Sequence, residues 1–425
     1  MLNSHFPGSC VVKEDDHDLV RTNPSSGTNK EETLALSKQI FTRPKIDWAI
    51  SSFNPNKASG EDGIFPGLIQ QAKDILITPL CNIFTTCLTL GYMPQSWTKV
   101  KVIFIPKSGK KDKTQPKAYM PISLTSTLLK IMEKIINDFI KSTYLTSFPL
   151  NKNQFAYQTG KSTVTALHKL VTKIEKTFRA KEIALAAFLD IEGAFDNASH
   201  SSIAIAMNKR DFHGGIVDWI SAMLMNRNVT ARLGDATITV KTTKGCPQGG
   251  VLSPLLWSLI VDDLLNSLEA LGFEIIGFAD DIVIITRGKH GQILSSRMQT
   301  ALNYTSVWCG NQGLNVNPSK TTLIPFTLRR KMEIRAPTLN GTELKFSSYV
   351  KYLGINIDTK LTWNKHLEQI VNKAKSALWV SQKTFGKKWG LNPKMIYWTY
   401  STIIQPKISY GALVWWPKTM EKPLK

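Results

Sequence analysis

The most constraining feature of this sequence is the tetrapeptide Phe278-Ala279-Asp280-Asp281, which lies between two apolar segments, residues 273–277 and 282–286. Residues that favour β-strands on both sides of a short break predict a β-hairpin with two acids at its tip. Adjacent carboxylates repel each other, and a fold retains them readily where a cation binds, because Mg²⁺ prefers oxygen ligands. The alternative is a solvated turn between two strands, so the pair needs partners elsewhere before it indicates phosphoryl-transfer chemistry.

Asp190 is a candidate partner for this pair, because it ends a predicted buried strand over residues 183–189. Two-metal catalysis needs carboxylates on separate strands that hold ions about 3.5–4 Å apart. A strand end and a hairpin tip satisfy this requirement. Asp280 and Asp281 point to different sides of the chain, and we expect Asp280 to be the stronger metal ligand. A second acidic pair, Asp262-Asp263, lies in a predicted apolar helix, where neighbouring side chains diverge by about 100°, and we interpret it as structural.

The charge of the chain favours a polyanionic partner. Its 425 residues have a net charge of +21, which is more than solubility requires. Seven lysines lie in residues 99–117, and twelve lie in residues 360–425, where tryptophans are interspersed. Basic residues mixed with flat aromatics suit contact with a nucleic acid, although aromatics in a basic helical domain are more often part of its core.

Other classes of protein are disfavoured by what the sequence lacks. The N-terminus has no secretory signal pattern, and no uninterrupted apolar run approaches the roughly 18–20 residues of a membrane span. The five cysteines include no C-x-x-C pair, and the seven histidines are dispersed. We therefore expect a soluble, intracellular protein of the nucleus, the cytoplasm or both, with neither a disulfide framework nor a zinc site.

Periodicity and turn residues predict a mixture of helices and strands. Residues 1–42 are polar and predict a loosely ordered lead-in. The predicted elements are helices within residues 64–90, over 125–144, over 162–178 and between Ser253 as N-cap and Gly272, strands over 100–105 and 183–189, and a hairpin of strands 229–233 and 236–240 joined by Gly234-Asp235.

Several ordered motifs resemble those of reverse transcriptases. The stretches similar to motifs A to E of that family, in order and at suitable spacing, are residues 188–196, 245–254, 278–281, 313–320 and 352–354. Those that resemble the finger motifs of non-LTR (LINE-type) retrotransposons are residues 57–64, 121–124 and 154–163. Trp389-Gly390-Leu391 and residues 410–416 are similar to jockey-like elements, and the resemblance covers roughly residues 45–416.

The resemblance implies an α+β fold, a right-hand polymerase with fingers, a palm made of an antiparallel sheet packed on helices, and a helical thumb. The expected divisions are a partly disordered lead-in at 1–42, fingers at 43–182, a palm with motifs A to E at 183–358, and a basic helical thumb at 359–425 that we expect to be truncated. The implied activity is that of an RNA-directed DNA polymerase, a nucleotidyltransferase that adds dNTPs to a primer 3′-hydroxyl by two-metal phosphoryl transfer in retrotransposon copying. The implied partners are an RNA template, a DNA primer, dNTPs and other parts of a retrotransposon polyprotein, without a membrane.

The resemblance also implies a role for each matching residue. Asp190, Asp280 and Asp281, with the backbone carbonyl of Ile191, would hold two Mg²⁺ ions, for which Mn²⁺ can substitute. Lys320 would protonate the pyrophosphate leaving group, or would be an ordinary surface lysine. The implied nucleotide and template residues are Phe195 as a steric gate against a ribose 2′-hydroxyl, with a core aromatic as its alternative, Gln248 and Gly249 beside the templating base pair, and Lys107 and Lys117 in the fingers loop.

One position departs from the family pattern. Met120 stands where an arginine that grips the incoming phosphates is usual, and Lys107 or Lys117 would replace it only as point charges. Two alternatives therefore remain, a catalytically weakened or silent RNA-binding remnant of such an element, and a polymerase with a different template, such as a group II intron maturase. The three intact aspartates argue against the first alternative, and the jockey-like motifs argue against the second.

Overall fold

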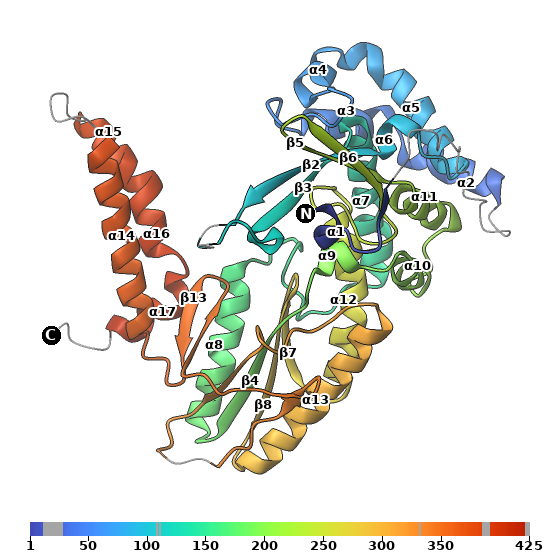
Figure 1. Ribbon diagram of the computed structural model, residues 1–425. Coiled ribbons are helices and arrows are strands. Elements are labelled where there is room, and N and C mark those ends of the chain that lie inside the picture. Colours follow the sequence, from blue (N-terminus) through green and yellow to red (C-terminus); the bar gives the residue numbers. More distant parts are fainter. Residues whose placement is uncertain (12–28, 108, 110–111, 331–332, 385–391, 421–425) are drawn as a thin grey trace. The chain divides into compact units, whose positions relative to one another are not determined.

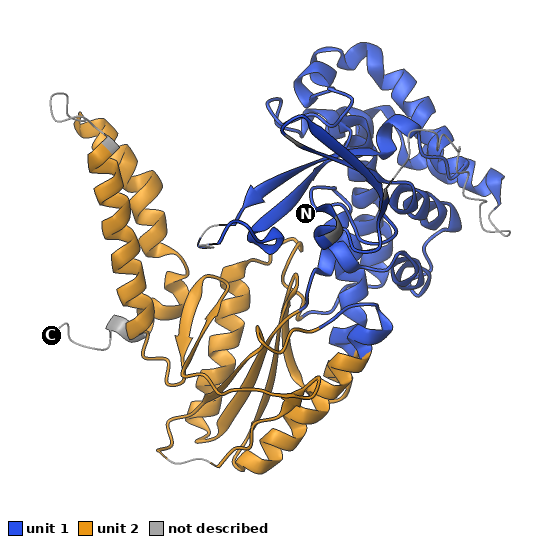
Figure 2. Cartoon of the chain, in the orientation of Figure 1, with its two compact units in different colours: residues 1–152, 191–266, 308–315 blue, residues 153–190, 267–307, 316–425 orange. Residues whose placement is uncertain are grey.

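The computed structural model describes residues 1–11, 29–107, 109, 112–330, 333–384 and 392–420. The chain forms two compact units, each made of segments that are far apart in the sequence (Figure 2). Unit 1 contains residues 1–152, 191–266 and 308–315, and unit 2 contains residues 153–190, 267–307 and 316–425. This division cuts across the consecutive segments expected from the sequence, because strands from distant segments pair within one unit.

A five-stranded sheet organises unit 1, with the strand order β1-β6-β5-β2-β3 (Figure 1). Neighbouring strands are antiparallel except β2 and β5, which are parallel. Alternation along β2 places Val100 and Val102 on the side that packs against Leu2 and Phe6 near the N-terminus. The strands are β1 Cys10–Val11, β2 Lys99–Pro106, β3 Tyr119–Leu124, β5 Asn228–Leu233 and β6 Ala236–Lys241.

Helices complete unit 1. Helix α7 buries Leu129, Met132 and Ile136, which recur at the spacing of one helix face. The helices are α1 Leu2–His5, α2 Lys30–Ile40, α3 Arg43–Ser51, α4 Pro66–Gln71, α5 Lys73–Thr89, α6 Gln95–Thr98, the 3₁₀ turn η1 Pro116–Ala118, α7 Thr127–Ser147, α9 Ala194–Asn197, α10 His200–Asn208, α11 Gly214–Met225 and most of α12 Ser253–Ala270.

The lead-in predicted over residues 1–42 is more ordered than expected where the structure describes it. Strand β1 pairs with β6, and α2 begins after an N-cap at Asn29. Inside α2, Thr33 Oγ1 donates to the Asn29 carbonyl at 2.8 Å, and Ser37 Oγ donates to the Thr33 carbonyl at 2.7 Å. The polar composition was misleading because these hydroxyls are satisfied within the helix. The prediction was wrong for residues 29–42, and residues 12–28 lie outside the described part.

Unit 2 is built around a fully antiparallel sheet with the strand order β7-β8-β4-β9. Strand β4 is buried from Ile183 to Leu189, and only its last residue, Asp190, is partly exposed. Helix α8 packs on β4 and β7, which confirms the predicted antiparallel sheet packed on helices. The elements are β4 Ile183–Asp190, β7 Glu274–Phe278, β8 Asp281–Gly288, β9 Thr322–Phe326, α8 Thr163–Arg179 and most of α13 Gly291–Asn311.

Two small hairpins and a group of C-terminal helices complete unit 2. They are β10 Thr338–Leu339, β11 Thr342–Glu343, β12 Tyr349–Tyr352, β13 Ile355–Asp358, α14 Asn364–Thr384, α15 Pro393–Thr399, the π-helix η2 Tyr400–Ile404, α16 Gln405–Ser409 and α17 Ala412–Met420. Trp363 and Trp415 are buried in the core of unit 2, whereas Trp379, Trp398 and Trp416 are exposed. The motif Trp389-Gly390-Leu391 lies outside the described residues.

Most predicted elements are confirmed. The helices predicted at 125–144 and 162–178 are α7 and α8, the strands predicted at 100–105 and 183–189 are β2 and β4, and the predicted hairpin is β5–β6. Helix α12 begins at Ser253 itself rather than after it, and Gly272, with φ of 79°, follows its end. None of the described helices combines the length and the hydropathy that a membrane span requires.

Candidate active site

Strands β7 and β8 form a hairpin whose turn is the dipeptide Ala279-Asp280. Phe278 and Asp281 are its last paired residues. Ala279 has a φ of 55°, in the left-handed region that residues with a Cβ atom seldom adopt, and its side chain is buried. The hairpin therefore keeps a strained turn where glycine would cost less, and such strain is typical of functional sites.

Strand β4 brings a third carboxylate to this tip. Asp190 pairs directly with Asp281 in the register of β4 and β8. Residues paired in this way have Cβ atoms about 4.5–5.5 Å apart. The structure thus places a strand end beside a hairpin tip, and the three acids predicted from the sequence lie together within unit 2.

Burial and mutual repulsion act on these acids. Burial, followed by the charges of Asp280 and Asp190, raises the pKa of Asp281 to about 7. The pKa of Asp280 is also raised, mainly by burial and further by the charge of Asp190, while the charge of Lys320 opposes this rise. A site in which the charged form of a carboxylate is disfavoured is one that a nearby cation stabilises.

Lys320 supplies one such cation from a segment distant in the sequence. Its Nζ donates to Asp190 Oδ2 at 2.7 Å, and both side chains are partly exposed. The turn that carries Lys320 is also joined to Asp190 through the backbone, because the Asn317 N–H donates to the Asp190 carbonyl at 3.4 Å. The sequence singled out Lys320 for the leaving group, but it did not predict this ion pair.

The donor set is of the kind that a hard divalent cation takes, since all three side chains offer carboxylate oxygens. Ile191, whose carbonyl the resemblance implicates, directly follows Asp190 and is buried. Within the described residues, no group of three or more histidine, cysteine or acidic side chains has the arrangement of a metal-binding cluster as it stands. The fit to a cation rests instead on the pKa values of Asp280 and Asp281, which burial raises first and the charges of neighbouring acids raise further.

Two tyrosines near the acids were missed in the sequence analysis. Tyr352 is buried, its hydroxyl has no hydrogen-bond partner among the described residues, and burial and the charge of Asp281 raise its pKa. Tyr157 is half-exposed, and its pKa is raised by burial and by the charge of Asp280. Both residues lie in motifs that resemble those of the family. The sequence therefore contained both tyrosines within these motifs, but it did not indicate that they lie near the acids.

The predicted gate and template residues belong to unit 1, where they lie on two adjoining segments. We call residues 245–251 the glycine loop. The Cys246 N–H donates to the Phe195 carbonyl at 2.7 Å, and the Ser123 N–H donates to the Gln248 carbonyl at 2.7 Å. Gly249 has a φ of 121°, and a Cβ atom there would lie 2.5 Å from the Ser123 carbonyl oxygen, so only glycine permits this approach.

Phe195 is partly buried, and its ring lies 6.1 Å from that of the buried Trp257. The neighbouring Asp196 has a pKa raised to about 7 by burial, which the charges of Arg227 and Lys107 oppose. The β2–β3 hairpin therefore brings the charge of Lys107 close to the segment that carries Phe195.

The other predicted residues of this hairpin are exposed. Lys117 lies in the 3₁₀ turn η1, and Met120 is 41% exposed on β3, opposite Ile105. The Lys107 N–H donates to the Ala118 carbonyl at 2.7 Å, so Lys107 and Lys117 emerge near the same end of the hairpin. Met120 itself brings no charge to this surface.

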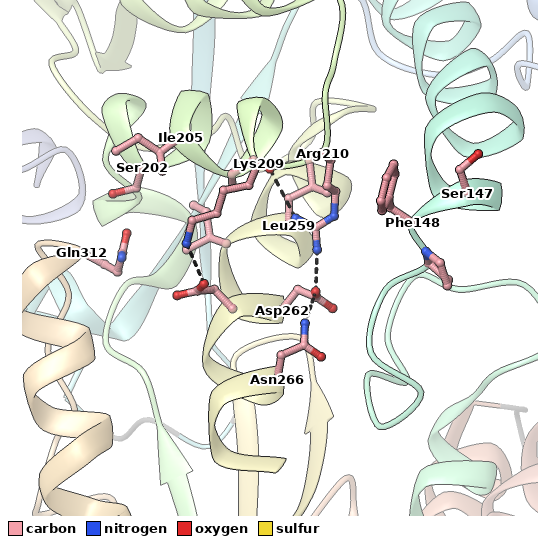
Figure 3. Close-up of a pocket in the computed structure, with 14 residues that line it drawn as sticks. Ser147, Phe148, Ser202, Ile205, Lys209, Arg210, Leu259, Asp262, Asn266 and Gln312 are labelled. Carbon is pink, nitrogen blue, oxygen red and sulfur yellow. Dashed lines mark hydrogen bonds and ion pairs between the residues drawn. The ribbon is translucent and has the colours of Figure 1, made fainter. Parts of the chain in front are cut away.

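The second acidic pair has the structural role expected for it. Asp262 is buried and forms an ion pair with Arg210 (Figure 3). Asp263 pairs with Lys209 at 2.8 Å. These residues line a pocket of about 380 Å³ within unit 1. Both acids are matched by cations from the end of α10 and the residues after it, so they are paired within the fold rather than gathered with other acids.

Comparisons with known proteins show which family the chain is similar to. Residues 105–357 match the family described as reverse transcriptase (RNA-dependent DNA polymerase). The chain is 28% identical to the probable RNA-directed DNA polymerase from transposon BS of Drosophila melanogaster, over 86% of this chain and 41% of that protein. It is 27% identical to the RNA-directed DNA polymerase from the mobile element jockey of Drosophila melanogaster, over 90% of this chain and 42% of that protein. The chain thus spans less than half of the length of these relatives.

Proposed function

The chain belongs to the reverse transcriptase (RNA-dependent DNA polymerase) family, and on this basis we propose that it is the polymerase of a non-LTR retrotransposon, which copies RNA into DNA. The proposed partners are an RNA template, a DNA primer and dNTPs, together with other parts of a longer polyprotein. The observation that carries the proposal is the direct pairing of Asp190 with Asp281 beside the turn residue Asp280.

We assign the polymerase subdomains as follows. The palm contains the β7-β8-β4-β9 sheet and its three acids. The fingers contain the five-stranded sheet with the β2–β3 hairpin, and the thumb contains the basic helices α14 to α17. In this assignment the motifs at residues 188–190 and 278–281 lie on the palm sheet, the motif at 245–254 contains the glycine loop, and Lys107 and Lys117 extend from the fingers.

Asp190 and Asp280 are proposed to hold two Mg²⁺ ions, with Asp281 and the Ile191 carbonyl in support and Mn²⁺ as a substitute. Such ions, when bound, lower the pKa of the attacking hydroxyl and neutralise charge on the phosphates. The raised pKa of Asp281 supports this assignment, because a divalent cation would offset the burial and the repulsion by Asp280 and Asp190 that raise it.

The remaining residues are proposed to position the nucleotide and to transfer a proton. Lys320, which pairs with Asp190 here, would release it and donate a proton to the leaving pyrophosphate. The ring of Phe195 would exclude a ribose 2′-hydroxyl, and the backbone of Gln248 and Gly249 would contact the templating base pair. Lys107 would attract the triphosphate as a point charge.

Primer extension on an RNA template with dNTPs and Mg²⁺ tests the proposal. The wild-type protein should extend the primer, and Asp280→Asn should reduce the rate about 10³-fold or more, because it removes a metal ligand. Asp235→Asn is a matched control, since Asp235 is also the second residue of a two-residue hairpin turn, and it should leave the rate unchanged. Equal rates for wild type and Asp280→Asn would exclude the proposed site.

A catalytically silent RNA-binding protein is the second candidate function. Met120 favours it, because this exposed side chain cannot hold a phosphate. The same assay separates the two functions when RNA binding is measured in parallel. Retained binding of the RNA template without extension by the wild-type protein would favour the silent binder.

A further inference from the structure

A buried arginine holds the first end of the glycine loop. Arg227 is 3% exposed, and its Nη2 donates to the Gly245 carbonyl and, at 3.3 Å, to the Lys244 carbonyl. Its Nε donates to the Leu224 carbonyl at 3.2 Å, so the guanidinium group joins the end of α11 to the loop. His200 Nε2 donates to the same Gly245 carbonyl at 3.2 Å. The guanidinium group is therefore held by the carbonyls of Leu224, Lys244 and Gly245.

A buried glutamate holds the far end of the loop. Glu133 of α7 is fully buried, and its Oε2 accepts from the Val251 N–H at 2.8 Å. Between the two ends, the Pro247 carbonyl accepts from Ser253 Oγ at 2.8 Å. Arg227 and Glu133 feel each other's charge, and Glu133 Oε1 has no hydrogen-bond partner among the described residues. The loop is thus held by charge-assisted bonds rather than by apolar packing alone.

The first end of the loop is joined in turn to the segment that carries Phe195. The Gly245 N–H donates to the Ala198 carbonyl at 2.8 Å, and the Cys246 N–H donates to the Phe195 carbonyl at 2.7 Å. A Cβ atom at Gly245 would lie 2.5 Å from the Asp196 carbonyl oxygen. The backbone of residues 195–198 therefore cannot shift without moving Gly245, whose carbonyl Arg227 holds.

We propose that Arg227 is a positioning residue for sugar selection, which fixes the Gly245 carbonyl and thereby sets where the Phe195 ring meets the 2′ position of the incoming nucleotide. This role rests on the proposed polymerase function. The proposed role concerns the position of the Phe195 ring rather than the chemical step. In this proposal, Arg227 contacts neither the three acids nor the substrate. A lysine at this position would keep the charge but, as a single donor centre, could not reach the Leu224 and Gly245 carbonyls together.

The test is the discrimination between dNTP and rNTP, measured as the ratio of the two kcat/KM values in primer extension. Arg227→Lys should lower this ratio about tenfold, mainly through a lower KM for the rNTP, because a small displacement of the Phe195 ring relieves its clash with the 2′-hydroxyl and has a large kinetic effect. Arg232→Lys is the matched control, because Arg232 is an exposed arginine on β5 whose side chain hydrogen-bonds to Thr237 across its own hairpin, and it should leave the ratio unchanged.

A double mutant separates positioning from general weakening. If Arg227 acts through Phe195, the variant Phe195→Ala with Arg227→Lys should discriminate no worse than Phe195→Ala alone. A merely structural role would lower both kcat/KM values by the same factor and leave the ratio unchanged, and that result would overturn the inference. Should Arg227→Lys fail to fold, His200→Asn perturbs the same Gly245 carbonyl, and an unchanged ratio in that variant would also overturn it.

Whether the wild-type protein extends the primer decides how the ratio is interpreted. Extension by wild type with an altered ratio in Arg227→Lys supports both the polymerase function and the positioning role. Extension by wild type with an unaltered ratio overturns the positioning role alone. No extension by wild type overturns the polymerase function, and the role of Arg227 in sugar selection with it.

Discussion

The two hairpins β5–β6 and β7–β8 have the same construction and different tips. Each joins antiparallel strands rich in β-branched residues through a two-residue turn that ends in aspartate. The β5–β6 turn places glycine at its first position, with a φ of 60°, and is exposed. The β7–β8 turn places Ala279 there, with a φ of 55°, and buries it next to three acids. The first hairpin follows the local rules for a turn, and the second departs from them at the proposed active site.

The largest expected difference between the two tips is catalytic. Asp190→Asn should lower the rate of primer extension about 10³-fold or more, as Asp280→Asn should, and Asp281→Asn should lower it less, about 10²-fold, because we assign Asp281 a supporting role. Single-turnover primer extension at saturating dNTP measures these rates. A greater loss in Asp281→Asn than in Asp280→Asn would reverse the proposed ranking of the two ligands.

A third hairpin, β2–β3, carries Met120, and a substitution there is expected to increase activity rather than to reduce it. Met120→Arg should raise kcat/KM for dNTPs about tenfold, because an arginine can bind phosphate oxygens in a bidentate manner. Met225→Arg is a control of the same chemistry, since Met225 is 44% exposed at the end of α11 while Met120 is 41% exposed. Equal kinetics in wild type and Met120→Arg would show that this position does not limit nucleotide binding.

The acids at the β7–β8 tip should make stability depend on pH when divalent cations are removed. Because the pKa of Asp281 is raised from 3.8 to about 7 in the folded protein, the folded state binds this proton more tightly than the unfolded state does. The resulting stability is present below about pH 4 and is lost as the pH rises through about 7. For this partly exposed group we expect a loss of about 1 kcal/mol in the free energy of unfolding between pH 5 and 8.

Chemical denaturation with a chelator present, at several pH values, measures this loss. Asp281→Asn should flatten the dependence, and excess Mg²⁺ should reduce it in the wild type. Asp235→Asn, at the other tip, should retain the wild-type slope. If Asp281→Asn also retains it, the repulsion at this site is not what makes stability pH-dependent.

The smallest expected effects concern the turns themselves, and they have opposite signs. Ala279→Gly should stabilise the fold by about 0.5 kcal/mol, since the relief of a left-handed φ exceeds the added chain entropy of glycine. Gly234→Ala should destabilise it by about the same amount, although a Cβ atom there would meet no heavy atom within 4 Å. Thermal or chemical unfolding of both variants checks the signs. Destabilisation by Ala279→Gly would mean that the alanine methyl contributes more by packing than its backbone costs.

Sequence reasoning predicted the strand and the turn that carry the candidate acids, because there the signal was local. The apolar run before Asp190 predicted the buried strand β4, and the break at Ala279-Asp280 predicted the hairpin tip. It failed over residues 29–42, because a polar composition does not reveal that Thr33 and Ser37 bond within α2 and face its buried side. Composition reports average solvation, whereas order depends on which face of a helix is buried.

Other features of the site were not predictable from any local pattern. The ion pair of Lys320 with Asp190 joins residues 130 positions apart, and no spacing rule connects them. Arg227 lies in a short connection between α11 and β5, where an arginine would ordinarily be exposed, but the fold buries it against the glycine loop. A sequence read in one dimension cannot indicate which distant carbonyl a guanidinium group will reach.

The sequence by itself determined the family, the alternation that forms the two hairpins, and the identity of the three acids, because these depend on residue type and on spacing along one segment. The tertiary structure decided the register that sets Asp190 opposite Asp281, the burial that raises the pKa of Asp281, and the fixing of the glycine loop by Arg227 and Glu133. Register, burial and long-range pairing arise only when segments from distant parts of the chain exclude water together. The Ala279-Asp280 turn therefore differs from the Gly234-Asp235 turn less in its own residues than in the residues that the fold places beside it.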